Sequence, residues 1–136
     1  MIRIYTDGSS RHADNKWYGA YAVAVYDGDT LVQQIAQTVT PGTNNASEMI
    51  AVLRALTIIR DNYPDEYVKI ITDSKYVIGG FTSDYKTNVE LWKLMKTLSG
   101  RLNIELEWVK GHHKDKRNKH VDKLAHRTLR RKFTEC

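Results

Sequence analysis

Alternating hydrophobic and polar residues open the chain and predict β-strands. The segment 2–6 alternates isoleucine with polar residues, which is typical of a half-buried strand. The segments 17–26 (WYGAYAVAVY) and 31–40 (LVQQIAQTVT) are rich in β-forming residues. The sequence Asp27-Gly28-Asp29 between them is typical of a hairpin turn, so we expect three consecutive antiparallel strands.

Helical and strand patterns alternate after Pro41-Gly42, which interrupts the sheet. The expected elements are a helix over 46–60, a strand over 67–72, a short helix from the capping residue Ser74 to Gly79-Gly80, a helix between Asn88 and Gly100, and a strand over 102–109. A polar, basic loop is expected over 110–118. It leads into a C-terminal helix whose inward-facing residues are Val121, Leu124, Ala125 and Leu129. This order predicts an α/β fold whose five-stranded mixed sheet has three antiparallel strands, then alternating helices and strands, with helices on both faces.

Length and composition limit the class of protein. A chain of 136 residues with 41% hydrophobic residues fits one globular domain over residues 1–136. The one cysteine, Cys136, excludes an internal disulfide and a cysteine zinc site, which favours a reducing, cytoplasmic location. The start MIRIYTDGSS does not resemble a signal peptide, and no apolar stretch approaches the roughly 20 residues of a membrane helix.

Positive charge is concentrated near the C-terminus. The net charge is +5, and the stretch 110–132 holds ten lysines and arginines against two acids, Asp115 and Asp122. Such a segment is a natural partner for a polyanion such as nucleic acid. It is equally typical of a solvated basic tail that aids solubility.

Two aspartates each follow an expected strand directly. Asp7 comes after the first strand, and Asp73 comes after the strand over 67–72. If these strands are neighbours, both carboxylates emerge side by side. Like charges this close repel each other, so a bound cation is the natural compensation.

Each acidic residue also has a purely structural interpretation. The spacing Asn45-x-x-Glu48 resembles a capping box, in which Glu48 would satisfy a free amide at the helix start. Asp122 opens the last helix and would interact favourably with its dipole. Asp7 and Asp73 precede Gly and Ser, a context common in turns.

Considered together, the motifs resemble ribonuclease H of the type 1 family over nearly the whole chain and in the same order. The matching segments are Tyr5-Thr6-Asp7-Gly8-Ser9, Thr43-Asn44-Asn45-x-x-Glu48, Thr72-Asp73-Ser74-x-Tyr76-Val77, and Trp108-Val109-Lys110-Gly111-His112 followed by Asn118-x-x-x-Asp122-x-Leu124-Ala125. The resemblance implies the ribonuclease H-like fold. It also implies an endonuclease that hydrolyses the RNA strand of RNA–DNA hybrids and leaves 5′-phosphate and 3′-hydroxyl ends.

The resemblance further implies that the catalytic carboxylates hold two Mg²⁺ ions, for which Mn²⁺ could substitute, and these residues are Asp7, Glu48, Asp73 and Asp122. All-oxygen ligands suit this hard cation, and two ions can clamp an in-line displacement at phosphorus. His112 matches the family's mobile histidine, which assists proton transfer or product release, although a histidine beside glycine is commonly only a solvent-exposed residue.

Substrate contacts follow from the same resemblance and involve nine residues: Gly8, Ser9, Thr43, Asn44, Asn45, Asn88, Trp92, Lys110 and Asn118. Gly8 and the two adjacent asparagines would follow the RNA strand, where contacts to the 2′-hydroxyl distinguish RNA from DNA. Thr43 and Asn88 would hold a phosphate of the DNA strand. Trp92 would line the DNA channel or belong to the core. The expected partner is the hybrid and not a membrane, and the expected state is a monomer.

Three departures from the family pattern affect substrate binding. The stretch 10–17 replaces a glycine-rich turn after the first strand. Pro41 stands where a basic residue is common, two positions before Thr43. The segment between Tyr76 and Asn88 is short and lacks the basic protrusion of some members. Grip on the substrate would then depend more on the basic C-terminal region or on a partner.

Two other classes of function share some of these features. A junction resolvase or an integrase-like strand-transfer domain also uses clustered carboxylates with Mg²⁺, but the segments 43–45 and 108–112 argue against both. A non-catalytic hybrid-binding module would have no need for four acidic residues that face a phosphate.

Overall fold

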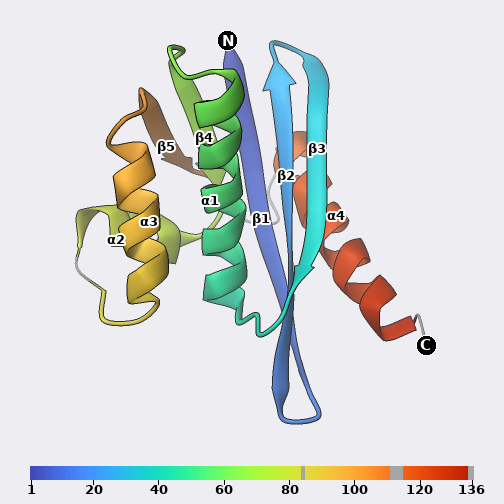
Figure 1. Ribbon diagram of the computed structural model, residues 1–136. Coiled ribbons are helices and arrows are strands. Elements are labelled where there is room, and N and C mark those ends of the chain that lie inside the picture. Colours follow the sequence, from blue (N-terminus) through green and yellow to red (C-terminus); the bar gives the residue numbers. More distant parts are fainter. Residues whose placement is uncertain (84, 111–114, 135–136) are drawn as a thin grey trace.

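The computed structural model describes residues 1–83, 85–110 and 115–134, and its centre is one five-stranded sheet (Figure 1). The strands are β1 (Ile2–Ala13), β2 (Lys16–Asp27), β3 (Thr30–Val39), β4 (Val68–Thr72) and β5 (Ile104–Trp108). Their spatial order is β3-β2-β1-β4-β5. The hairpin-connected strands β1, β2 and β3 pair antiparallel, while β1, β4 and β5 pair parallel, so the expected mixed sheet is confirmed.

Helices cover both faces of the sheet, as expected. They are α1 (Asn44–Asn62), α2 (Lys75–Thr82), α3 (Val89–Ser99) and α4 (Lys116–Thr134). Helix α1 packs on β1 and β2 with α3 beside it, and α4 lies alone across the other face of β1, β2 and β3 (Figure 1). Successive strand residues point to opposite faces, so Ile4 joins the core under α1 whereas Tyr5 joins the core under α4.

Strand β1 is longer than the hydrophobic pattern indicates. It continues through the polar residues 7–13 because the matching length of β2 pairs with it up to Ala13 and Lys16. The turn between them places Asp14 and Asn15 at φ values of 52° and 62°, the left-handed geometry that suits a two-residue hairpin. Asp7 therefore lies within β1, and the expectation that it follows the strand was wrong.

Helix α1 begins two residues earlier than expected, and its cap is Thr43. The Thr43 hydroxyl accepts a hydrogen bond from the Ala46 N–H at 3.2 Å. The capping-box interpretation of Asn45 and Glu48 is wrong, because Asn45 lies inside the helix and Glu48 is buried. A Cβ on Gly8 would lie 2.6 Å from the Glu48 backbone nitrogen, so only glycine lets α1 approach β1 this closely.

The remaining elements differ from expectation mainly at their ends. Ser74 caps α2 as expected, but the helix continues through the glycine pair to Thr82. Asn88 precedes α3 without capping it through its side chain, which donates to the Tyr76 hydroxyl instead. Strand β5 is shorter than 102–109, and α4 begins at Lys116, inside the expected loop. In the described part of the chain, no helix combines the length and apolarity that crossing a membrane requires.

The close contact at Gly8 predicts a specific loss of stability. Gly8→Ala should destabilise the protein by about 1–3 kcal/mol, because its methyl group would force the α1 backbone away from β1. Thermal unfolding measures this change. Gly100→Ala is the control, since its nearest neighbour would be 3.3 Å away. Equal effects of the two substitutions would contradict this account of the helix–strand contact.

Candidate metal centre

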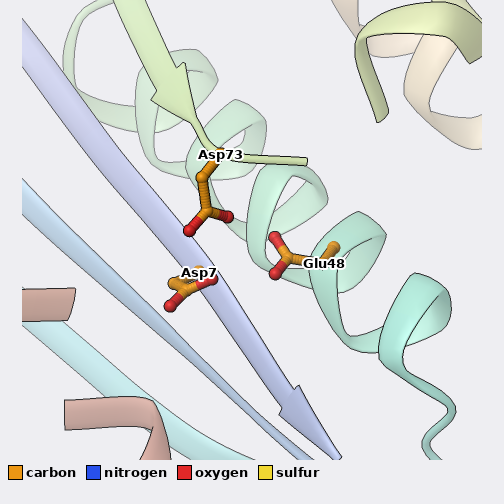
Figure 2. A group of neighbouring side chains, drawn as sticks. All are labelled: Asp7, Glu48 and Asp73. Atoms are coloured by element: carbon orange, nitrogen blue, oxygen red, sulfur yellow. The ribbon is translucent and has the colours of Figure 1, made fainter. Parts of the chain in front are cut away.

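The pairing of β1 with β4 brings Asp7 and Asp73 together. Their parallel register aligns Tyr5 with Ile71, and two further steps along both segments reach Asp7 and Asp73. Strand β4 ends at Thr72, so no strand among the described residues pairs with that side of β1 from Asp7 onward. Glu48 of α1 reaches the same place, and ligand oxygens of the three carboxylates lie within 4.8 Å of one another (Figure 2).

Asp122 approaches this group from α4 on the other face of the sheet. Its charge acts on Glu48 and Asp73, and its carboxyl group also helps to raise the pKa of Asp7. Its side chain keeps 30% exposure, whereas Asp7 and Glu48 are almost fully buried. The structure thus brings three of the four predicted acids, Asp7, Glu48 and Asp73, within ligand distance of one another, and it places Asp122 outside this group.

Burial and crowding hold protons on these acids. Burial and then the charge of Glu48 raise the pKa of Asp7 well above its ordinary value. Burial raises the pKa of Glu48 to about 7, although a hydrogen bond with Asp7 opposes the shift. Burial also raises the pKa of Asp73, against hydrogen bonds with Asp7 and Asn118 that lower it. Without a cation, the fully ionised cluster is therefore strongly disfavoured.

Hydrogen-bond donors around the cluster reach some of its oxygen atoms but not all of them. The Gly8 N–H donates to Asp7 Oδ1 at 2.9 Å, and the Asn118 side chain lies near enough to Asp73 to lower the pKa of its carboxyl group. Within the described residues, Glu48 Oε2 and Asn118 Oδ1 are buried without a hydrogen-bond partner. Buried oxygen atoms without partners are costly. These atoms and the all-carboxylate donor set fit a hard divalent cation such as Mg²⁺ or Mn²⁺.

His126 is a residue of the site that the sequence reasoning missed. Its Nε2 lies 3.3 Å from Asp122 Oδ1 one helical turn earlier, and its Nδ1 lies 3.1 Å from Ser9 Oγ. This histidine therefore links the acid on α4 to the neighbouring strand. The i, i+4 spacing from Asp122 was the available sequence indication, because residues at this spacing share one face of a helix.

Some of the residues expected to contact RNA are exposed, and others are buried. Asn44 and Asn45 are exposed in the first turn of α1, and the Gly8 backbone lies beside the carboxylates. Ser9 is buried, and its hydroxyl interacts with His126. Asn118 is only 2% exposed and lies near Asp73, whose pKa it lowers.

The residues expected near the DNA strand lie around α1 and α3. Thr43 is exposed at the start of α1, and Asn88 is half-buried before α3. Trp92 is 4% exposed and packs against Tyr76, so it belongs to the core. Its indole N–H donates to the Tyr76 hydroxyl, which also accepts from Asn88.

Two residues complete the predicted set. Lys110 is exposed after β5. His112 lies outside the described residues, and its catalytic role stays a prediction.

Comparison with known proteins identifies the family. A family model described as RNase H matches residues 1–130. Ribonuclease H from Ruthia magnifica subsp. Calyptogena magnifica is 36% identical over 141 residues, which cover 91% of this chain and 92% of that protein. Ribonuclease HI from Pseudomonas aeruginosa is 31% identical over 143 residues, with coverages of 93% and 92%.

Solved structures agree in fold. LC11-RNase H1 in complex with an RNA/DNA hybrid matches with a TM-score of 0.80 and 19% identity, covering 98% of this chain and 99% of that one. The N-terminal RNase H domain from Mycobacterium tuberculosis has a TM-score of 0.76 and 23% identity, with coverages of 94% and 98%. Sequence, fold and the buried acidic cluster lead to one conclusion: the chain belongs to the RNase H family of metal-dependent nucleases.

Proposed function

We propose that the chain, as one catalytic domain over residues 1–136, hydrolyses the RNA strand of RNA–DNA hybrids internally. The observation that carries this function is the convergence of Asp7, Glu48 and Asp73 at the open edge of β1. The similarity to proteins named ribonuclease H supports the substrate class. Action as a monomer and a cytoplasmic location stay predictions.

The four acids would hold two divalent ions, Mg²⁺ or Mn²⁺. The chemistry that two such ions supply is activation of a water and stabilisation of the leaving 3′ oxygen in an in-line displacement at phosphorus. This chemistry leaves 5′-phosphate and 3′-hydroxyl ends. Bound cations would also neutralise the ionised acids and attract the phosphate that is cut.

The protein's own residues position the reacting groups. The Gly8 N–H orients Asp7 through a hydrogen bond, and the Asn118 side chain lies beside Asp73. The packing of α1 on β1 sets the place of Glu48. Asn44 and Asn45 stand exposed at the start of the same helix, where they would contact the RNA strand. His112 would assist proton transfer or product release.

Cleavage of a panel of nucleic acids tests this function. The enzyme should cut the RNA of a hybrid with Mg²⁺ and stop when a chelator is added. Duplex DNA, duplex RNA and a four-way junction should remain intact under the same conditions. Equal cutting of duplex DNA or of the junction would favour a resolvase or a strand-transfer domain.

Removing one carboxylate should separate cleavage from binding. We expect Asp7→Asn or Asp73→Asn to abolish hybrid cleavage while hybrid binding remains, because the amide weakens cation binding without adding bulk. Asp65→Asn, at an exposed acid in a turn, is the matched control and should stay active. Full activity in the Asp7 or Asp73 variant would refute the metal-site assignment.

The raised pKa values predict an inverse pH dependence of stability without metal. Glu48 binds its proton more tightly in the folded protein, with a pKa raised from 4.5 to about 7, so stability should fall as pH rises from about 5 to 8. The limit is about 3.5 kcal/mol, since one pKa unit corresponds to about 1.4 kcal/mol. Thermal unfolding in chelator measures this fall.

Adding Mg²⁺ and substituting Asp7 provide two further tests of the effect of the acids on stability. Mg²⁺ should restore stability at pH 8, because it binds the folded site. Metal-free Asp7→Asn should melt no lower than metal-free wild type, since it relieves repulsion in the cluster. A clear drop in its melting temperature would show that these acids do not crowd one another.

A further inference from the structure

A stripe of cations runs along the outer surface of α4. Its members recur at spacings of three or four residues, are all exposed, and are Lys116, Lys119, Lys123, Arg127 and Arg130. Residues at these spacings share one helix face. The stripe extends for about 21 Å, because each helical residue rises about 1.5 Å.

Three hollows join along this stripe. The first hollow, of about 310 Å³, is lined by Asp122 and Lys123. The second, of about 410 Å³, shares Lys123 with it and continues past His126 to Arg130. The third, of about 300 Å³, shares His126 and Arg130 and reaches Arg11 at the end of β1. We call this continuous path the α4 groove; it leads from a catalytic acid to the β1–β2 hairpin.

Within the described residues, three cations of the α4 groove have no carboxylate as an ion-pair partner. No carboxylate in the described part of the chain lies within ion-pair distance of Lys123, Arg127 or Arg130. Arg117, on another side of the same helix, does pair with Asp29 at 3.5 Å. The stripe is thus available to an external anion, whereas Arg117 takes part in internal structure.

The far end of the groove adds an aromatic residue to the cations. The Arg11 guanidinium lies 4.2 Å from the centre of the Phe133 ring. Arg130 and Ser10 line the same hollow. Guanidinium groups beside small polar side chains are typical of contacts to a phosphate backbone.

We propose that the α4 groove binds the phosphate backbone of the RNA strand as this strand leaves the metal centre. This inference rests on the proposed function, since the strand that is cut must lie against Asp122, where the groove begins. Helix α3, where Asn88 is expected to meet the DNA strand, packs over the other face of the sheet. The two strands of the hybrid would then contact different helices of the protein.

The α4 groove also takes the place of a missing basic surface. Between α2 and α3, the described residues 83 and 85–88 contain one cation, Lys86. The five exposed cations that α4 supplies beside the site would compensate for the lack of positive charge between α2 and α3. Phosphate contacts of this kind make binding strongly dependent on salt.

Paired substitutions of equal charge test the groove. Arg127→Gln/Arg130→Gln removes two groove cations, and Arg60→Gln/Arg101→Gln removes two exposed arginines at the ends of α1 and α3. Binding to a fluorescent hybrid is measured in chelator over a salt series, after unfolding curves confirm that both variants fold. The groove variant should bind at least about tenfold more weakly at 0.1 M salt. The slope of log affinity against log salt concentration should become less steep by about 1–2. The control variant should match wild type.

Hybrids with single-stranded extensions identify the strand. The loss in the groove variant should persist when RNA extends beyond the duplex and shrink when only DNA extends. A loss that follows DNA, or equal losses in both double variants, would overturn the inference. Unchanged hybrid binding with weakened binding to phosphatidylserine vesicles would instead assign the stripe to a membrane surface.

The same experiment separates this inference from the proposed function. A wild-type protein that cuts no hybrid contradicts the proposed function, whatever the groove binds. A wild-type protein that cuts hybrids, with a groove variant that binds them at wild-type affinity and salt slope, contradicts the groove alone.

Discussion

Repulsion among buried carboxylates is the interaction on which the rest of the structure depends. Asp7, Glu48 and Asp73 come within 4.8 Å of one another at a place where water is largely excluded. Isolated negative charges in such surroundings are costly, so the folded protein holds protons there unless a cation binds. The repulsion within the cluster therefore lowers the stability of the metal-free protein, and metal binding removes this repulsion.

The sheet makes this crowding unavoidable through a mismatch in strand length. Strand β1 continues beyond the end of β4, so the edge next to Asp7 is open and α1 can approach it over Gly8. On the opposite face, α4 brings Asp122 near enough to raise the pKa of Asp7. Apolar packing of both helices on the sheet, rather than any attraction among the acids, supplies the free energy that holds the cluster together.

The sequence allowed much of the fold to be predicted, because alternating and helical hydrophobic patterns mark every strand and helix. It did not show that β1 includes Asp7, since residues beyond 6 are polar and their pairing depends on the turn at Asp14 and Asn15. Glu48 had the spacing of a cap, and only tertiary packing reveals that it is buried. His126 was missed because its second partner, Ser9 on β1, comes near it only when α4 packs on this strand.

The central claim is that the converging acids form one divalent-cation site. A crystal structure grown with Mn²⁺ tests it most directly, because anomalous scattering locates this ion without assumptions about its ligands. The account predicts strong anomalous density between Asp7, Glu48 and Asp73, with Asp122 at its outer side. Density confined to other parts of the protein, with these carboxylates free of metal, would contradict it.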